Sequence, residues 1–249
     1  MMIYNDERLD EVNDKLTLIQ KPDGLTFGTD ALLLAGYVSG KFGRGCELGG
    51  GSGIISMLLV TRDKINTVTV YEVQKEYADL IRRNAEHNRL EDRISAEHKD
   101  IRELTADEDC EIAFTNPPYM KCDSGAQNAT DAKTIARHEI CGDIRDFCKA
   151  AAKKLKFGGS FYAVYRPDRL SDIMAAMREC KLEPKRMTFV HADTEKESSM
   201  VLIEAKRGAK SGMMLTPPLM IYTDTSHKEY SSDMNHIMEN GSFPKKYKR

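Results

Sequence analysis

One segment decides the fold: residues 45–53 read GCELGGGSG, and the apolar run IISMLLV follows at 54–60. This order predicts a short strand that enters a glycine-rich turn and then a helix. Glycines let a backbone approach a ligand closely, and the positive N-terminal end of a helix favours polar or charged groups. Such a turn also occurs without any ligand, so the segment predicts a strand-turn-helix unit but does not by itself identify a cofactor.

The pattern continues from about Gly45 to Lys206, where short β-prone runs alternate with amphipathic helical runs. Stacked βαβ units of this kind form a parallel sheet. Strands are expected at Gly45–Leu48, Thr67–Glu72, Ile94–His98, Glu111–Thr115, Ser160–Tyr165, Met187–His191 and Met200–Ala205. Helices are expected at Ile54–Thr61, Gln74–Arg89, Ile144–Leu155 and Pro167–Cys180. We therefore expect an α/β fold with a seven-stranded, mostly parallel sheet and helices on both faces.

Two helix ends carry local signals. Thr29 or Asp30 fits as the N-cap of the apolar run 31–38, because either side chain can accept a hydrogen bond from a free amide of the first turn. A lysine-rich turn at 153–156 precedes Gly158-Gly159. Basic residues in a last turn followed by glycine predict a helix C-terminus there.

Composition and charge exclude several classes of protein. The chain has 249 residues, with 37 basic and 39 acidic side chains and a formal net charge of -2, which argues against a protein that coats nucleic acid without specificity. The apolar runs 31–38 and 53–60 are far shorter than the roughly 20 residues that span a bilayer. The N-terminus lacks the pattern of a secretory signal, so we expect a cytoplasmic protein without membrane contact.

The six cysteines contain no Cys-x-x-Cys pair and have no nearby histidine at the spacing of zinc ligands. This pattern predicts reduced thiols that pack as small hydrophobic side chains, and no metal site.

Two acids are expected at the edge of the sheet where parallel strands end. Glu72 closes the strand 67–72, about 20 residues after the glycine turn, where a carboxylate can accept hydrogen bonds from both hydroxyls of a ribose. Asp100 follows the strand 94–98 and could accept a hydrogen bond from an adenine amino group, although a surface acid in a charged loop explains it equally well. The glycine turn and Glu72 together indicate a cofactor that contains a nucleoside.

The strand 111–115 delivers Asn116-Pro117-Pro118-Tyr119 to the same edge. Proline restricts the preceding residue to extended backbone, so this turn is stiff. It presents two acceptors, the Asn116 side-chain carbonyl and the Pro117 backbone carbonyl, beside the ring of Tyr119. A planar amine that attacks a methyl group needs this arrangement, because the carbonyls hold its hydrogens and the ring stacks on its π system. No strong base is needed when the leaving group is a neutral thioether released from a sulfonium.

With these three motifs in order, the segment 45–205 resembles the class I S-adenosylmethionine-dependent amino-methyltransferases, whose fold is Rossmann-like. Within that superfamily the whole chain resembles the bacterial valine-tRNA adenine-N6-methyltransferase family, which modifies the adenosine at position 37 beside the anticodon. Further residues that carry this resemblance are FGTDALLL at 27–34, ARHE at 136–139, EPKR at 183–186, PPL at 217–219 and IY at 221–222.

The resemblance implies S-adenosylmethionine as the cofactor and tRNA as the partner. The implied cofactor contacts are Gly28, Thr29, Asp30, Glu47, Gly49, Gly51, Gly53, Glu72, Asp100 and Asn116. The implied catalytic residues are Asn116, Pro117 and Tyr119. The sequence departs from the family at Glu47, where aspartate is usual, and by one additional glycine in the turn. The longer side chain at 47 puts the polar contacts of the cofactor, and hence its affinity, in question.

Because the cofactor and base sites fall on successive strands of one sheet, we expect one domain over 1–249. It comprises an N-terminal cap at 1–44, a catalytic core at 45–206 and a C-terminal extension at 207–249.

The stretch 120–139 is polar and rich in turn residues, and has the length of an active-site lid. Lys121, Lys133, Arg137 and His138 would supply partners for phosphates beside a flipped nucleotide, although a plain flexible insertion explains the stretch as well. Further basic clusters stand at Lys185-Arg186, at Lys206-Arg207 with Lys210, and at Lys245-Lys246-Lys248-Arg249.

Three alternatives remain at this stage. N5-methylation of a protein glutamine would use the same acceptor turn, but too few residues precede Gly45 for the helical substrate domain of the enzymes that it resembles. A catalytically inactive module that binds the cofactor or RNA would not need an intact acceptor turn. A nicotinamide-dependent dehydrogenase would use the glycine turn but gives no role to Asn116-Pro117-Pro118-Tyr119. The sequence leaves monomer and homodimer equally open.

Overall fold

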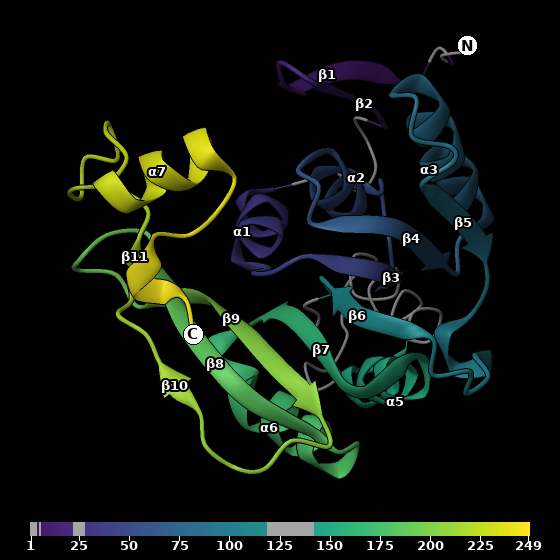
Figure 1. Cartoon of the computed structure of the whole chain (residues 1–249). Helices are drawn as coiled ribbons and strands as arrows, with labels where there is room; N and C mark the ends of the chain where they lie inside the picture. The colour runs from purple at the N-terminus through teal and green to yellow at the C-terminus, as the bar shows by residue number, and fades with distance from the viewer. Residues whose placement is uncertain (1–3, 5, 22–27, 119–141) are drawn as a thin grey trace, which may run out of the picture.

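A nine-stranded sheet forms the centre of the molecule (Figure 1). The computed structural model of the chain describes residues 4, 6–21, 28–118 and 142–249. The strand order is β10-β8-β9-β7-β6-β3-β4-β5, and β11 also pairs with β8. A separate two-stranded sheet contains β1 and β2.

The elements have the following bounds. The strands are β1 (Arg8–Asn13), β2 (Leu16–Gln20), β3 (Phe42–Leu48), β4 (Ile65–Glu72), β5 (Ile94–His98), β6 (Cys110–Thr115), β7 (Leu155–Tyr165), β8 (Leu182–His191), β9 (Ser198–Arg207), β10 (Met214–Leu215) and β11 (Leu219–Met220). The helices are α1 (Thr29–Tyr37), α2 (Ile54–Thr61), α3 (Lys75–His87), α5 (Ile144–Lys154), α6 (Leu170–Glu179) and α7 (Ser232–Asn240), with short 3₁₀ helices η1 (Ile101–Glu103), η2 (Pro167–Arg169) and η3 (Lys245–Tyr247). The seven expected strands are confirmed as β3 to β9, most of them longer than predicted.

The sheet is mostly parallel, as the sequence predicts. β5, β4, β3, β6 and β7 pair in parallel, and β9 pairs antiparallel with both β7 and β8. The sequence did not predict β10 and β11, which each add two residues in parallel to β8. The ends of β3 to β7 therefore meet at one side of the sheet, termed the carboxyl edge, and their starts meet at the other, termed the amino edge.

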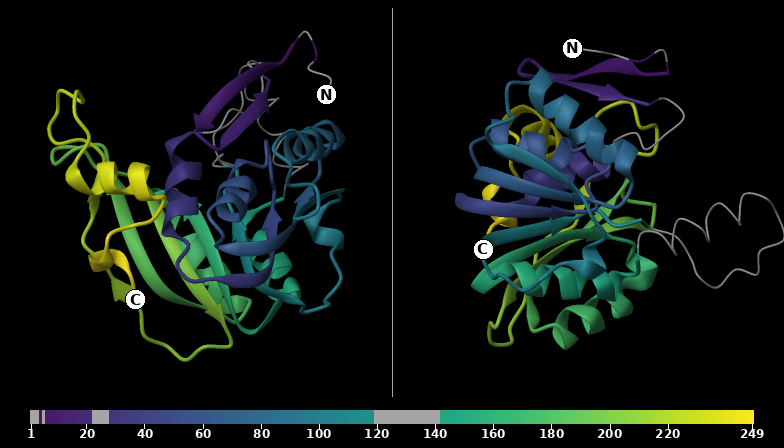
Figure 2. Two further views of the ribbon diagram at one scale, coloured as in Figure 1. Left: turned by 45° about the horizontal axis from the view of Figure 1, so that its top comes forward. Right: turned by 90° about the vertical axis from the view of Figure 1, so that its right-hand side faces the viewer.

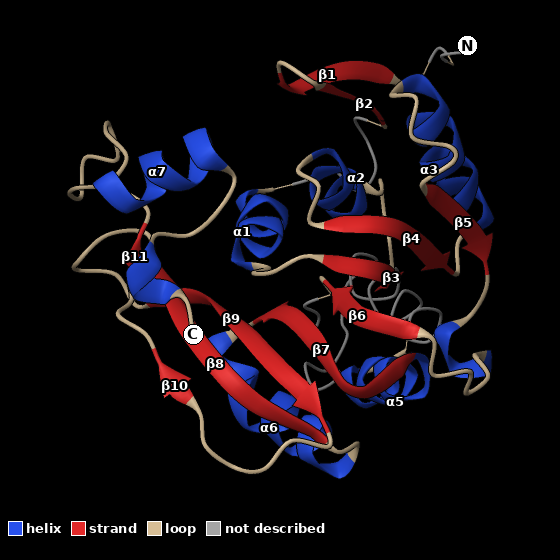
Figure 3. Cartoon of the chain, in the orientation of Figure 1, coloured by secondary structure: helices blue, strands red, loops and turns tan. Residues whose placement is uncertain are grey.

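Helices cover both faces of the sheet, which confirms the predicted layers (Figures 2 and 3). One hydrophobic core contains Leu58 of α2 and Ile237 of α7, together with residues of α1 and α3. The other core contains Phe147 of α5 and Ile173 of α6. Both cores hold the strands in fixed register, so the side chains at the carboxyl edge have defined positions.

The hairpin β1–β2 was not predicted. Its first strand reads RLDEVN and is mostly exposed, so it lacks the apolar alternation of a half-buried strand. Asn84 of α3 holds the second strand: the Ile19 N–H donates to Asn84 Oδ1 at 2.7 Å, and Asn84 Nδ2 donates to the Ile19 carbonyl at 3.1 Å. A side chain far along the sequence thus satisfies the backbone of β2.

The predicted N-cap of α1 is wrong. Gly28 caps the helix with extended backbone, and Thr29 and Asp30 are its first two residues. The cap makes no side-chain hydrogen bond. The Asp30 carboxylate still accepts a hydrogen bond from a first-turn amide, the Ala31 N–H, but it does so from inside the helix.

The C-terminus of α5 lies within one residue of the expected Leu155 and has Lys153 and Lys154 in its last turn, but the prediction that glycines cap the helix is wrong. The helix ends at Lys154, and Leu155 has extended backbone and already belongs to β7. Gly158 and Gly159 lie within β7, where the pairing with β6 is irregular and Gly158 has a positive φ of 79°. The glycines therefore serve a bulge in a strand rather than a helix cap. The helix expected at 167–180 divides into η2 and α6.

Candidate active site

The glycine-rich turn lies at the carboxyl edge between β3 and α2. Gly49, Gly51 and Gly53 have positive φ angles of 73°, 54° and 81°, which side chains rarely allow. A Cβ atom at Gly50 would overlap with Val70, whereas a Cβ atom at Gly51 would meet no atom within 4 Å. The turn is therefore packed against the sheet on one side and open on the other.

Glu72 ends β4 beside this turn and is 4% exposed. Its Oε2 accepts a hydrogen bond from the Gly51 N–H at 3.0 Å, and its Oε1 accepts one from the Gln74 N–H at 2.9 Å. Burial raises the pKa of the carboxyl group, and the backbone hydrogen bonds oppose this effect. The structure thus brings together the two features that predicted a nucleoside-containing cofactor.

Glu47 lies near the end of β3, but its carboxylate is bound to α2. Ser56 donates to Oε2 from both its hydroxyl group and its N–H, the latter at 3.3 Å. The side chain is 1% exposed, and burial raises the pKa of the carboxyl group to about 8, against the effect of the Ser56 hydrogen bonds. Glu47 therefore joins β3 to α2, and its contact with a cofactor stays a prediction.

Asp100 follows β5 at the carboxyl edge and caps η1. Its Oδ1 accepts a hydrogen bond from the Arg102 N–H at 2.9 Å, and the Arg102 Nε lies 3.0 Å and 2.9 Å from the two carboxylate oxygens. The hydrogen bond from the guanidinium group lowers the pKa of Asp100. The carboxylate thus has a structural role at the predicted place, and its contact with an adenine stays a prediction.

Asn116 follows β6 at the same edge. The preceding Thr115 donates from its hydroxyl group to the Leu48 carbonyl at 2.7 Å, which fixes the end of β6 beside the glycine turn. Asn116 Nδ2 donates to Asp30 Oδ2 at 2.8 Å. Because a carboxylate only accepts hydrogen bonds, Asp30 selects the amide nitrogen, and the Asn116 carbonyl is directed to the other side of the amide group.

Asp30 is held in place by its neighbours in α1. The Ala31 N–H donates to its Oδ1 at 2.8 Å. A Cβ atom at Gly28 would lie 2.9 Å from this same oxygen, so the glycine leaves room for the carboxylate. Thr29 is exposed beside it. The upstream motif and the acceptor turn therefore meet at one hydrogen bond, which the sequence did not predict.

A hollow of about 800 Å³ adjoins Asp30. The end of β7 and the loop between β8 and β9 form it, and its lining includes Thr29, Asp30, Arg166, Asp168, Ser199 and Met200. Arg166 donates to Asp168 through Nε at 2.8 Å and through Nη2 at 2.7 Å. Sequence reasoning missed this pair, although Arg166 directly follows an expected strand, which is the signal that identified Asn116.

Several predicted residues lie outside the described part of the chain: Tyr119, the stretch 120–139 and its basic side chains. Beside them Pro117 is buried and Pro118 is half-buried. In the ranges that the structure describes, no group of three or more His, Cys, Asp or Glu side chains is placed to hold a metal ion. No described helix has the length and apolarity needed to cross a membrane. The described cysteines, at 46, 110, 148 and 180, are free thiols.

The basic cluster Lys185-Arg186 is not a surface cluster as the sequence suggested. Arg186 is fully buried at 0% exposed, and its Nε lies 2.8 Å from Glu204 Oε2. It is therefore part of the core and has no access to RNA.

Solved structures of other proteins share this fold. A solved structure of a predicted O-methyltransferase from Agrobacterium tumefaciens has a TM-score of 0.70 and 21% identity, and covers 86% of this chain and 98% of that chain. A methyltransferase from Pyrococcus furiosus has a TM-score of 0.59 and 16% identity, covering 80% and 92% of the respective chains. The fold is thus the Rossmann-like fold of the class I methyltransferases.

Proteins that are similar in sequence carry a more specific name than these structures. A protein from Dyadobacter fermentans named tRNA1(Val) (adenine(37)-N6)-methyltransferase is 24% identical over 84% of this chain and 87% of its own length. A protein of the same name from Porphyromonas gingivalis is 27% identical over 71% and 72%. The family model described as "Methyltransferase small domain" matches residues 22–180. The chain belongs to this methyltransferase family.

Proposed function

We propose that this protein transfers a methyl group from S-adenosylmethionine to the exocyclic N6 of an adenosine in tRNA, at position 37 of a valine tRNA. The observation that carries the proposal is the place of Asn116, at the carboxyl edge beside the glycine turn and directly before Pro117 and Pro118. The relatives named for this activity favour adenosine over a protein glutamine, and an active enzyme over a binding module. A tRNA substrate is consistent with the cytoplasmic location expected from the sequence.

The residues at the carboxyl edge fit the cofactor. The glycines at 49–53 permit close approach of the backbone, and open space borders Gly51. The adjoining Glu72 carboxylate suits the ribose hydroxyls, and Asp100 suits the adenine amino group. We assign Gly28, Thr29 and Asp30 to the methionine end. When bound, S-adenosylmethionine supplies an electrophilic methyl group on a sulfonium, whose release gives a neutral thioether.

The chain's own residues hold the target amine. The Asn116 carbonyl and the Pro117 backbone carbonyl each accept one amine hydrogen, so that the nitrogen lone pair is aligned for attack. Both oxygens carry partial negative charge, which stabilises the positive charge that develops on the nitrogen. We assign the stacking on the base to Tyr119, which lies outside the described residues. The proton leaves the product nitrogen after methyl transfer, when that nitrogen is strongly acidic.

The hollow beside Asp30 is the place that we assign to the flipped nucleotide. It opens at the end of β7 and reaches Asp30, which binds Asn116, and its apolar surface at Pro167 and Met200 suits a base. Its carboxylates at Asp30, Asp168 and Glu197 outnumber the one cation in the described lining, Arg166, so the flanking phosphates need cations from outside this lining. We keep one domain over 1–249 for this activity, with the extension 207–249 beside β8.

Replacing Asn116 with alanine tests the proposal. The variant should lose at least about 100-fold in turnover, as enzymes do when one stabilising polar group at the reacting atoms is removed. Cofactor affinity, measured by calorimetry, should change little. Mass spectrometry of tRNA nucleosides measures N6-methyladenosine, and Asn66→Ala, an exposed asparagine in β4, is the matched control. Full activity of Asn116→Ala would overturn the mechanism, and an unmodified tRNA pool after incubation with the wild-type protein would overturn the function.

A further inference from the structure

A second hollow, of about 760 Å³, opens at the amino edge of the sheet, opposite the active site. Residues 39–42 line it where β3 begins, Lys185 lines it in the early part of β8, and Ser160 and Tyr162 line it from the middle of β7. Lys206 lies near the end of β9, which runs antiparallel to β7. Strand length separates its lining in β3 and β7 from the carboxyl edge by about 10 to 20 Å, at about 3.3 Å per residue.

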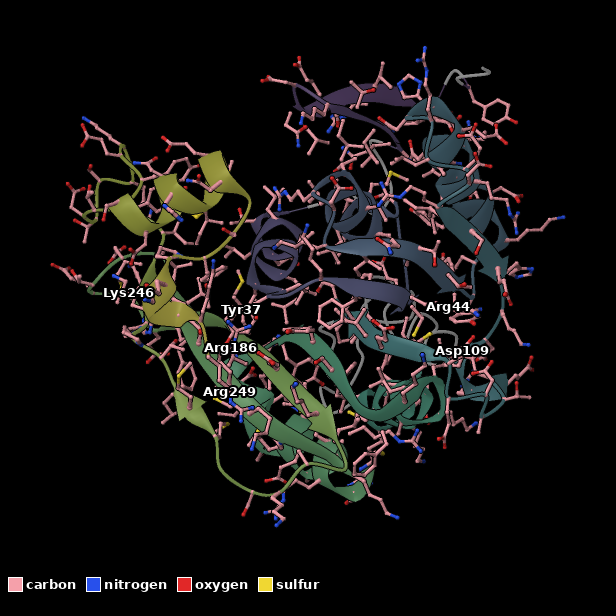
Figure 4. All side chains as sticks on the ribbon, in the orientation of Figure 1. Tyr37, Arg44, Asp109, Arg186, Lys246 and Arg249 are labelled. Atoms are coloured by element: carbon pink, nitrogen blue, oxygen red, sulfur yellow. The ribbon has the colours of Figure 1, made fainter. Side chains whose placement is uncertain are left out.

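Positive charge gathers in this hollow, termed the basic hollow. Six cationic side chains line it: Lys41, Lys185, Lys206, Lys210, Lys248 and Arg249. Across the residues that the structure describes, none of these six forms an ion pair. Two other cations at the amino edge are paired: Arg44 lies 2.5 Å from Asp109 (Figure 4), and Arg207 lies 2.6 Å from Glu108.

The carboxylate in the described lining does not compensate this charge. Glu204 belongs to the lining, but it is 5% exposed and its Oε2 lies 2.8 Å from Nε of the buried Arg186. Figure 4 shows Arg186 and Arg249 over the same part of the sheet. Glu204 therefore serves as the counter-charge of a buried cation and forms no ion pair with the six described cations of the basic hollow.

The lining is built into the fold. Lys185 is 6% exposed, and its Nζ donates to the Lys210 carbonyl at 2.9 Å. This bond fastens the segment after β9 to β8, so that Lys210 stands at the rim of the basic hollow. Gly208 and Gly212, on either side, have positive φ angles of 69° and 116°. The segment therefore follows a defined path, and its lysines are not those of a loose tail.

Like charges that gather without counter-charges repel one another, and a polyanion removes that repulsion. Lysines act as point charges and contact phosphates without reading sequence. Five of the six side chains are at least partly exposed and come from separate segments, which fits an extended backbone better than one enclosed phosphate. We propose that the basic hollow binds the phosphodiester backbone of the tRNA, away from the base that is methylated. The proposal rests on the proposed function, because tRNA is its substrate.

The test reverses three exposed charges of the basic hollow in one variant, Lys41→Glu, Lys210→Glu and Lys248→Glu. The control variant, Lys15→Glu, Arg89→Glu and Lys149→Glu, makes the same change of net charge at exposed cations outside the lining of the basic hollow. Binding of a valine tRNA transcript is measured by fluorescence anisotropy over a range of salt concentrations. We expect the first variant to bind about 10-fold more weakly and its salt dependence to fall by about 2 to 3 in slope, while the control stays close to wild type.

Four further measurements separate the outcomes: affinity for S-adenosylmethionine, turnover, binding of the isolated anticodon stem-loop, and binding of tripolyphosphate as a small polyanion. Affinity for S-adenosylmethionine and turnover at saturating tRNA should be unchanged in the first variant, because the basic hollow is remote from the active site. The isolated anticodon stem-loop should bind both variants about equally. The proposal would be overturned if the first variant folded and bound tRNA with the same affinity and salt dependence as the wild-type protein. It would also be overturned if the variant lost only its binding of tripolyphosphate. A wild-type protein that binds tRNA through the basic hollow but never methylates it would overturn the proposed function alone.

Discussion

Asp30 and Asn116 stand 86 positions apart in the chain and share one hydrogen bond of 2.8 Å. The bond decides which way the Asn116 amide faces, because the carboxylate accepts only from the nitrogen. The Ala31 N–H and the absence of a side chain at Gly28 in turn decide where the Asp30 carboxylate lies. The motif Gly28-Thr29-Asp30, which the resemblance assigned to the cofactor, thus also positions the acceptor turn.

Replacing Asp30 with alanine should therefore lower kcat by about 10- to 100-fold, since a hydrogen bond to a charged group contributes about 1.5–3 kcal/mol. Asp30→Asn keeps an acceptor oxygen and should retain more activity than Asp30→Ala. Steady-state kinetics gives kcat and the KM for tRNA, and calorimetry gives the cofactor affinity. An unchanged kcat together with weaker cofactor binding would show that Asp30 serves the cofactor alone.

The sequence located site residues where a single local rule applied. Glu72 and Asn116 each directly end or follow an apolar strand, and the glycines stand between a strand and a helix, so the carboxyl edge of a parallel sheet could be predicted to gather them. The Asp30–Asn116 bond could not be predicted, because it depends on how α1 packs beside the end of β6. Arg166 was open to prediction by the same rule but lacks a motif that marks it.

At the scale of elements, Glu47 ties β3 to α2 through Ser56. Burial raises the pKa of Glu47 to about 8, and the nearby Glu72 adds to the shift. Between the ordinary pKa of a glutamate and pH 8 the native state keeps the proton that the unfolded chain has released. The stabilising contribution of this proton is therefore full below the ordinary pKa and is lost as the pH rises through about 8.

Glu47→Gln cannot release this proton, so its stability should fall less than that of the wild type from about pH 5 to about pH 8. Thermal unfolding followed by circular dichroism at several pH values measures the difference. Glu97→Gln, at an exposed position of β5, is the control and should follow the wild-type curve. If the stability of Glu47→Gln changed with pH in the same way as that of the wild type, the Glu47 carboxyl group would be ionised in the native protein at neutral pH.

Elements differ in how far their own sequence predicts them. The seven strands β3 to β9 are short β-prone runs that alternate with helical runs, and α2 begins directly after the glycine turn, so the local pattern sufficed. The hairpin β1–β2 has an exposed first strand and depends on hydrogen bonds from Asn84. The strands β10 and β11 have two residues each and form by pairing with the free edge of β8. The glycine cap predicted at Gly158 was wrong because a glycine that follows lysines occurs both after helix ends and at bulges in strands.

At the scale of the whole molecule, Arg186 connects the N-terminal helix to the C-terminal extension. Its Nη2 donates to the Tyr37 carbonyl at 2.7 Å and its Nη1 to the Tyr247 carbonyl at 2.8 Å. The guanidinium carbon also lies 3.8 Å from the centre of the Tyr37 ring, and Figure 4 shows the two residues together. With Glu204 of β9 as its counter-charge, one side chain joins α1, β8, β9 and η3.

Arg186→Met should destabilise the protein by about 3–5 kcal/mol, because it leaves the Glu204 carboxylate buried without a cation. The double variant with Arg186→Met and Glu204→Gln should lose less stability than the two single variants lose in sum, by at least about 1 kcal/mol in the free energy of unfolding. Urea unfolding followed by circular dichroism measures all three. Arg44→Met, which breaks the exposed pair with Asp109, is the matched control and should cost at most about 1 kcal/mol. Strict additivity at Arg186 and Glu204 would mean that the buried pair does not couple the two ends of the chain, and that apolar packing alone holds the extension in place.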